Sequence, residues 1–345
     1  NAKCTLLTGC PVKRVHFKIL LPLFVGFIIT AQGFAAELTS MHKILPEYRE
    51  KAATFLFHME NEADVEAFMK APVQSFPNIT PEVIHADNVE LRIYRPKNTE
   101  SGTALPVIYY SHGGGYLLRG AYNNMPKYQM MADRMNVAVV TPKYRTSMEA
   151  SFPAALEDAY KGLKFVKTSG ANYGLNTDKI IIMGDSAGGG LTAALALYNR
   201  DHDNLKLNGQ ILIYPMLDSR TGSKDDIYNA PYTGQVCWDR ETNAFAWKKL
   251  AGYKKIPKKM RQYYSPAFAK NLKDLPPAMI YVGDLDLFVN EDISYGNKLI
   301  SQGIDTEMHV IPGVYHGFDA AVPNAKATID FWNTVAYKVD CFMNR

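Results

Sequence analysis

The feature that most constrains the fold is a serine between glycines, at the junction of an apolar run and a helix-prone run. Residues 179–183 read Lys-Ile-Ile-Ile-Met, residues 184–189 read Gly-Asp-Ser-Ala-Gly-Gly, and residues 191–197 are rich in Leu and Ala. This order predicts a strand, a tight turn with Ser186 at its apex, and a helix. The flanking glycines suit a turn so tight that side chains there would meet neighbouring backbone. Ser186 would then sit at a helix N-terminus, where backbone N–H groups favour negative charge.

A second glycine run follows another apolar segment. His112-Gly113-Gly114-Gly115-Tyr116 comes directly after the apolar stretch 106–110. Glycines after a strand expose successive N–H groups, and in acyl transfer such donors stabilise the oxyanion of the tetrahedral intermediate. A flexible loop and a phosphate-binding loop are the alternatives, but the spacing matches neither of the common glycine-rich phosphate motifs. Together with Ser186, the run indicates an oxyanion site.

A serine nucleophile needs a base, and three histidines follow Ser186. His202 lies in a polar stretch, which favours a solvated loop. His309 lies in a segment that alternates like a strand, so it is expected within the sheet. His316 follows that segment in a loop flanked by Gly313 and Gly317. We therefore predict His316 as the base.

The base in turn needs an orienting carboxylate, expected between Ser186 and His316 after a strand. The apolar run 277–283 is such a strand, and Asp284-Leu285-Asp286 follows it. Spacing alone does not choose between Asp284 and Asp286. One is expected to orient His316, and the other to cap or position the loop.

These motifs resemble those of the hormone-sensitive-lipase-like esterases, a bacterial branch of the α/β-hydrolases. The resemblance rests on His-Gly-Gly-Gly, Gly-Asp-Ser-Ala-Gly-Gly and Tyr-His-Gly-Phe, and covers roughly residues 80 to 335. It implies that Asp286, which precedes Leu287-Phe288, is the catalytic aspartate that orients His316. It also implies that the oxyanion donors are the N–H groups of Gly114, Gly115 and Ala187. No cofactor is implied.

The rest of the chain predicts an α/β fold with a mostly parallel sheet and helices on both faces. Apolar, β-rich segments recur at 89–95, 107–111, 137–141, 180–184, 210–214, 279–283 and 307–311, with helix-like stretches between most of them. The chain is 47% hydrophobic and 21% charged, as expected of one sizeable core over residues 36–345. The resemblance makes this an α/β-hydrolase catalytic domain.

Two segments interrupt the alternation of strands and helices. Residues 47–72 are rich in helix formers and large apolar side chains, and residues 218–264 are rich in aromatic ones. Ordinary surface helices are one interpretation. The resemblance favours the other, a helical cap over the mouth of the active site, which would exclude water and shape the acyl pocket.

The N-terminal segment differs in character from the rest. Lys13, Arg14 and Lys18 precede the apolar residues 19–29, and small residues follow to Ala36. The order predicts a signal peptide over residues 1–35, with a retained membrane anchor as the alternative. The protein is accordingly expected to be periplasmic or secreted, or else membrane-anchored, with membrane contact only if the leader is retained.

The N-terminal segment also carries the net charge. The formal charge of the chain is +4, and Lys3, Lys13, Arg14 and Lys18 precede any acid. The remainder is neutral, so no nucleic-acid partner is expected. Cys237 and Cys341 lie beyond the leader and would be free to pair in an oxidising compartment. No His and Cys cluster has the spacing of a metal site.

The sequence leads to three hypotheses about function. The first is a serine carboxylesterase that hydrolyses short- to medium-chain acyl esters of small molecules through Ser186, His316 and Asp286. The second is an amidase or formamidase with the same three residues, since the pocket decides which bond is cleaved. The third is a non-catalytic receptor of the same fold, which three intact catalytic residues argue against.

Overall fold

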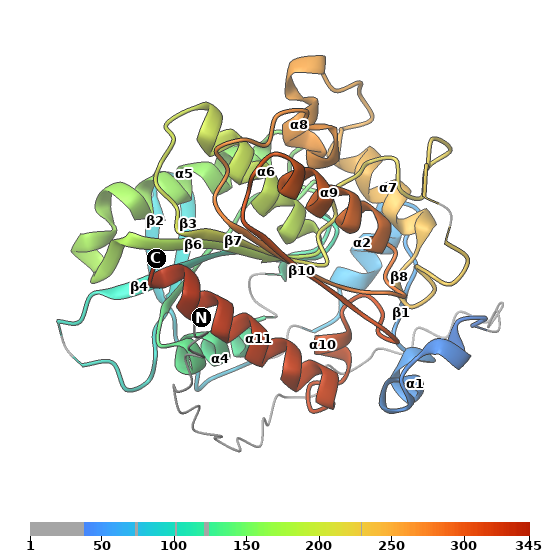
Figure 1. Ribbon diagram of the computed structural model, residues 1–345, viewed down its shortest axis with the longest axis horizontal. Helices are drawn as coiled ribbons and strands as arrows, with labels where there is room; N and C mark the ends of the chain where they lie inside the picture. Colours follow the sequence, from blue (N-terminus) through green and yellow to red (C-terminus); the bar gives the residue numbers. More distant parts are fainter. Residues whose placement is uncertain (1–37, 73–74, 101, 121–123, 229) are drawn as a thin grey trace, which may run out of the picture.

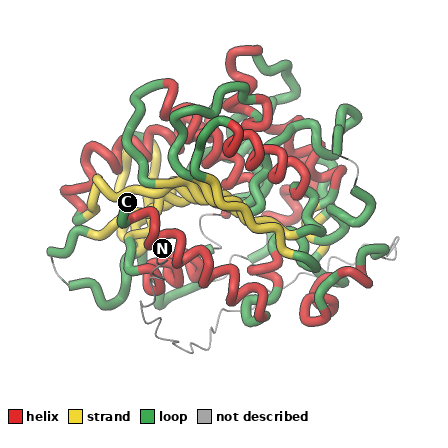
Figure 2. Tube along the Cα trace, viewed as in Figure 1, coloured by secondary structure: helices red, strands yellow, loops and turns green. Residues whose placement is uncertain are grey.

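An eight-stranded sheet runs through the middle of the molecule (Figures 1 and 2). The computed structural model describes residues 38–345 except 73–74, 101, 121–123 and 229. The strand order is β10-β9-β7-β6-β4-β5-β3-β2. Its strands are β2 (Glu82–Ala86), β3 (Val89–Tyr94), β4 (Leu105–Ser111), β5 (Ala138–Pro142), β6 (Leu175–Asp185), β7 (Gly209–Ile213), β9 (Ala278–Gly283) and β10 (Thr306–Ile311). The β2–β3 and β3–β5 pairings are antiparallel, and the other pairings in this sheet are parallel.

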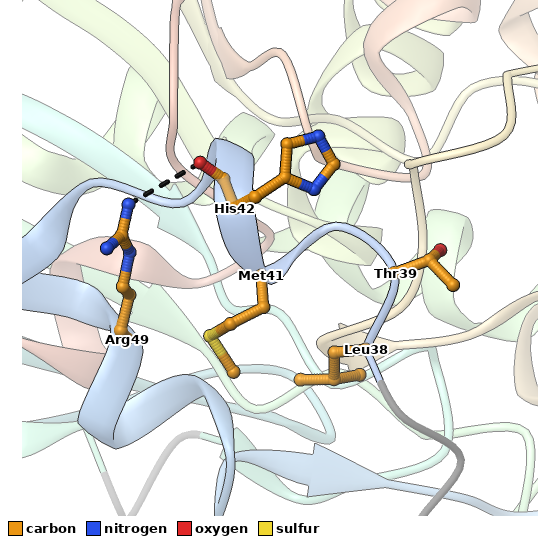
Figure 3. Close-up of a pocket in the computed structure, with 5 residues that line it drawn as sticks. All are labelled: Leu38, Thr39, Met41, His42 and Arg49. Carbon is orange, nitrogen blue, oxygen red and sulfur yellow. Dashed lines mark hydrogen bonds between the residues drawn. The ribbon is translucent and has the colours of Figure 1, made fainter.

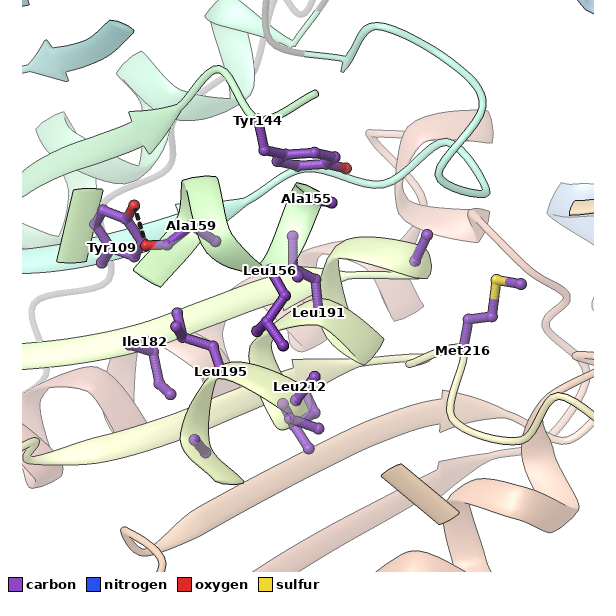
Figure 4. Packing of buried hydrophobic residues seen from close by; sticks show 14 of the residues in the cluster. Tyr109, Tyr144, Ala155, Leu156, Ala159, Ile182, Leu191, Leu195, Leu212 and Met216 are labelled. Atoms are coloured by element: carbon purple, nitrogen blue, oxygen red, sulfur yellow. Dashed lines mark hydrogen bonds between the residues drawn. The ribbon is translucent and has the colours of Figure 1, made fainter. Parts of the chain in front are cut away.

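The central strands are apolar throughout because both faces of the sheet are buried. Consecutive side chains point to opposite faces, so Ile182 packs into one hydrophobic cluster while Ile181 and Met183 pack into the other. Figure 4 shows the first cluster, in which Ile182 and Leu212 of the sheet meet Leu195 and other helix residues.

Helices cover both faces of the sheet (Figure 1). The first cluster receives side chains from α5 (Ala154–Ser169), α6 (Ala187–Asp201) and α9 (Val289–Ser301). The second receives them from α4 (Met125–Met135) and α11 (Lys326–Met343). The predicted fold class, a mostly parallel sheet between two helical layers, is therefore confirmed.

The two segments that interrupt the alternation lie side by side. The first contains α1 (Pro46–Ala52), β1 (Leu56–Phe57) and α2 (Glu62–Met69); the second contains β8 (Cys237–Trp238), α7 (Arg240–Leu250) and α8 (Arg261–Tyr264). β1 and β8 pair in parallel as a small separate sheet. Nζ of Lys249 lies 2.7 Å from a carboxylate oxygen of Glu62 and adds an ion pair. We call these two segments together the cap segments.

Two further points of the sequence analysis concern the N-terminal leader and the cysteines. The predicted signal peptide, residues 1–35, lies outside the described residues. No helix within the described part of the chain combines the length and the apolar character needed to cross a membrane. Cys237 and Cys341, for which the sequence left pairing open, are both free thiols.

Candidate active site

Ser186 occupies a strained turn between β6 and α6. Its backbone has φ 56° and ψ −125°, a conformation that residues other than glycine rarely adopt. The turn leaves no room at its flanks. A Cβ atom built on Gly184 would lie 2.3 Å from the carbonyl oxygen of Gly188, and one built on Gly188 would lie 2.1 Å from that of Ser111. Strain of this kind is maintained where the surrounding structure enforces it, often at functional sites.

A chain of hydrogen bonds joins Ser186, His316 and Asp286. Oγ of Ser186 lies 2.8 Å from Nε2 of His316, and Nδ1 of His316 lies 2.7 Å from Oδ2 of Asp286. The exposed fractions of these residues are 6%, 5% and 0%, in the same order. They follow β6, β10 and β9, whose carboxyl ends meet at one edge of the parallel sheet. The structure thus brings together three residues that lie up to 130 positions apart.

Asp284 and Asp286 have different surroundings. Asp286 is fully buried, and its second oxygen accepts a 2.9 Å hydrogen bond from the N–H of Phe288. Asp284 is exposed, and its carboxylate accepts the N–H of Gly313 at 2.7 Å. Asp284 therefore ties its loop to the loop that leads to His316, and Asp286 contacts His316 itself.

The glycine run lies directly beside Ser186. A Cβ atom built on Gly113 would be 3.2 Å from Cβ of Ser186. Gly114 and Gly115 both have positive φ, at 115° and 62°. Among the described residues, no hydrogen-bond acceptor engages the N–H groups of Gly114, Gly115 or Ala187. These three donors remain available to an incoming oxygen atom.

His112 supports the glycine run from inside the protein. Its ring stacks on that of Tyr144, with 4.2 Å between centroids, and its Nδ1 lies 2.8 Å from the carbonyl oxygen of Gly113. The hydroxyl of Tyr144 donates to the carbonyl oxygen of His112 at 2.7 Å. Burial lowers the pKa of His112 to about 4, so the imidazole is neutral at pH 7.

An ion pair beneath the turn was not found by sequence reasoning. Nζ of Lys127, on α4, lies 3.0 Å from Oδ2 of Asp185, and the hydroxyl of Tyr110 donates to Oδ1 of the same carboxylate at 2.7 Å. The N–H of Gly113 also donates to Oδ1, at 3.1 Å. Burial acts to raise the pKa of Asp185, but the Lys127 charge and these hydrogen bonds outweigh it and lower the pKa.

The cap segments contribute Trp238 to the surroundings of the site. A Cβ atom built on Gly115 would lie 2.2 Å from the edge of the Trp238 ring, so the indole packs directly on this glycine. The ring N–H of Trp238 donates to Oδ1 of Asn243 at 3.0 Å, and the side-chain amide of Asn243 donates to the carbonyl oxygen of Thr221 at 2.7 Å. Trp238 is 5% exposed and held in one orientation by these bonds.

A hollow elsewhere on the molecule does not coincide with this site. It has a volume of about 520 Å³ and is lined by Leu38, Thr39, Met41, His42 and Arg49 (Figure 3). None of these residues belongs to the predicted site. Within the described ranges, no three His, Cys, Asp or Glu residues are grouped so that they would hold a metal ion.

Comparison with known proteins decides the family. Residues 108–320 match the family described as alpha/beta hydrolase fold. This chain belongs to the α/β-hydrolases, in their hormone-sensitive-lipase-like branch. The matched range includes every predicted catalytic and oxyanion residue.

Sequence relatives and solved structures agree with this assignment. Esterase LipI of Mycobacterium tuberculosis is 31% identical over 238 residues, which cover 68% of this chain and 72% of LipI. Carboxylesterase NlhH of the same organism is 30% identical over 239 residues, covering 67% of this chain and 71% of NlhH. A solved structure of a bacterial heroin esterase superposes with a TM-score of 0.77 and 25% identity, over 88% of this chain and 99% of that one.

Proposed function

We propose that this protein is a serine carboxylesterase that hydrolyses small-molecule esters with short- to medium-length acyl chains. Its relatives are esterases, which supports the reaction class. The observation that carries the proposal is the continuous hydrogen-bonded chain from Ser186 through His316 to Asp286, beside three N–H donors without acceptors among the described residues. Non-catalytic binding needs no such chain.

In the proposed mechanism, His316 moves one proton in each half of the reaction. Nε2 of His316 takes the hydroxyl proton of Ser186 as Oγ attacks the ester carbonyl carbon, and the proton then passes to the departing alcohol. Water next gives a proton to His316 and attacks the acyl-enzyme. His316 then passes this proton to Oγ of Ser186 as the acyl–Oγ bond breaks, which releases the acid and restores both residues. Asp286 accepts the Nδ1 proton of His316 in a hydrogen bond and so keeps the tautomer that has Nε2 free.

The three free N–H groups are proposed to bind the developing oxyanion. The donors come from Gly114, Gly115 and Ala187, the last at the N-terminus of α6, where the helix dipole also favours negative charge. Loss of one such donor costs about 10²–10³ in kcat in a well-studied protease.

The test combines a substitution with covalent labelling. Ser186→Ala removes the nucleophilic oxygen and is expected to lower kcat by at least about 10⁴-fold while leaving the thermal unfolding profile unchanged. An organophosphonate should label Ser186 in the wild-type chain, as peptide mass spectrometry would show. Labelling of a different serine, or an active Ser186→Ala variant, would disprove the assignment.

The same preparation decides between an ester and an amide substrate. Hydrolysis is measured on a series of esters of increasing acyl length and on one amide matched in acyl and leaving groups. We expect kcat/KM to rise about fourfold with each methylene that becomes buried and then to fall once the pocket is full. A higher kcat/KM on the matched amide would favour the amidase, and comparable rates on long-chain triglycerides would point to a lipase.

A further inference from the structure

One stretch, which begins in the cap segments and continues into the chain after them, contains basic residues and no acidic ones. Residues 242–273 hold nine of the 38 Lys and Arg residues of the chain and none of its 34 Asp and Glu residues. Eight of the nine are lysines. Five of these, which we call the cap lysine patch, lie on α7 and in the chain between α7 and α8: Lys248, Lys254, Lys255, Lys258 and Lys259.

The cap lysine patch is exposed and forms no ion pair with an acid among the described residues. All five side chains are exposed, and none lies within 4.0 Å of a carboxylate oxygen of a described residue. Lys249 behaves differently, because it is half-buried and paired with Glu62. A charge run is usually a solvated surface, but such surfaces normally mix both signs. Five unpaired like charges within twelve residues favour a polyanionic partner.

Apolar side chains separate the pairs of lysines. Tyr253 precedes the first pair and is 63% exposed. Its hydroxyl donates to Glu62 at 3.3 Å, which fixes the ring at the surface. Ile256 lies between the two pairs and Met260 follows the second, both partly exposed. Lysine stems and tyrosine rings suit a boundary between water and lipid, since each has an apolar body and a polar end.

The buried side of this stretch reaches the candidate active site. Trp247 and Tyr264 flank the patch in sequence and pack on each other, with 5.0 Å between ring centroids. The Trp247 ring also lies 6.2 Å from the ring of Tyr116, which directly follows Gly115. In Figure 1 the chain between α7 and α8 projects at the top of the molecule, away from the sheet.

We propose that the cap lysine patch binds the surface of membranes rich in anionic phospholipids. Recognition of nucleic acids and phosphopeptides favours arginine, which forms paired hydrogen bonds with phosphate, or rows of aromatic rings that stack on bases. The patch has point-charge lysines interleaved with apolar residues, which suits headgroup phosphates above an acyl layer. This binding goes beyond ester hydrolysis and does not depend on Ser186. It would hold the proposed esterase at a surface in which apolar esters accumulate.

The test measures sedimentation of the full-length chain with vesicles of equal parts phosphatidylglycerol and phosphatidylcholine. The patch variant replaces Lys254, Lys255, Lys258 and Lys259 with Gln. The control variant makes the same change in charge at four dispersed, exposed lysines, Lys97, Lys164, Lys206 and Lys326. A lysine near an anionic membrane is worth about a fivefold change in partition, so the patch variant should bind roughly 100- to 1000-fold more weakly. The control should bind nearly as well as wild type.

Further measurements make the result specific. Replacement of the same four patch residues with Arg should preserve binding, and about 0.5 M NaCl should abolish it by screening. All variants should keep wild-type unfolding temperature and wild-type kcat/KM on a soluble short-chain ester, and Ser186→Ala should bind vesicles like wild type. Equal loss in the patch and control variants, undiminished binding by the patch variant, or stronger binding to single-stranded DNA than to vesicles would each overturn the proposal.

Discussion

At the scale of single residues, two acids two positions apart are expected to matter very unequally. Asp286→Asn removes the acceptor that fixes His316 and should lower kcat by about 10⁴-fold, as the equivalent change does in a well-studied protease. Asp284→Asn changes an exposed carboxylate that binds a backbone N–H, and it should cost less than about tenfold. Steady-state kinetics of both variants on one ester provides the measurement. The opposite ranking would show that the other carboxylate orients the base.

The ion pair beneath Ser186 gives a second prediction at this scale. Lys127→Met leaves the buried Asp185 without its cation and should destabilise the fold by about 3–5 kcal/mol. Because Asp185 also binds the N–H of Gly113, displacement of the glycine run should lower kcat by about 10- to 100-fold with little change in KM.

The conservative variant and the pH dependence provide the controls for Lys127. Lys127→Arg keeps the charge and should recover most of the lost kcat. The pKa of Asp185 is lowered in the folded protein, so its contribution to stability is present above the unfolded pKa of about 4 and is lost on acidification through the folded pKa. Denaturant titrations should therefore show that the loss of unfolding free energy caused by Lys127→Met becomes smaller at low pH. A raised KM with an unchanged kcat would contradict the role of Lys127 in positioning the glycine run.

How far these residues can be predicted depends on how local their signals are. Ser186 and His316 follow from short motifs beside predicted strands. The choice of Asp286 over Asp284 needed a family resemblance, because both follow the same strand at almost the same spacing. Lys127 lies 58 positions from Asp185 and gives no local signal. Its role follows only from the packing of α4 beneath the sheet.

At the scale of elements, β8 is expected to set the depth of the acyl pocket. Trp238→Ala should remove the ring that packs on Gly115 and shift the preferred acyl chain to longer lengths, with about fourfold in kcat/KM for each methylene that enters the vacated space. Stability should fall by about 3–5 kcal/mol. The ester series of increasing acyl length is the measurement.

A second tryptophan provides the matched control for Trp238. Trp332 is also buried, at 4% exposed, but it lies on α11 in the cluster beneath the sheet. Trp332→Ala should destabilise the protein by a similar amount and leave the acyl-length profile unchanged. An identical shift in both variants would mean that loosened packing, and not the position of Trp238, changes the profile.

Elements with long apolar runs could be predicted, and short ones could not. The seven predicted strands correspond to β3 to β7, β9 and β10, because burial on both faces makes most of these runs continuously apolar. β2 was missed because three of its five residues are exposed. β1 and β8 have two residues each, too few to show any periodicity. Their pairing follows from tertiary packing and not from local sequence.

At the scale of the whole molecule, His112 links stability to pH. The folded pKa is about 4, below the ordinary value of 6.5, because burial opposes protonation. The unfolded chain therefore binds more protons between these values, and stability should fall as the pH drops from 6.5 to 4, by up to about 3 kcal/mol. Denaturant titrations across this range should show that the difference in unfolding free energy between wild type and His112→Gln narrows by that amount as the pH falls. A difference in unfolding free energy that stays constant with pH would contradict the lowered pKa of His112.

The pairing of β1 with β8 has a consequence for the biogenesis of the protein. Leu56 pairs with Cys237, so the first strand of the small sheet leaves the ribosome about 180 residues before its partner. At roughly 5–20 residues per second, β1 waits on the order of 10–35 seconds before it can pair. The glycine run of the nascent chain therefore lacks the Trp238 ring that packs on Gly115 until about two thirds of the chain has been made. A protein that is exported before this moment would pair β1 with β8 only after it has crossed the membrane.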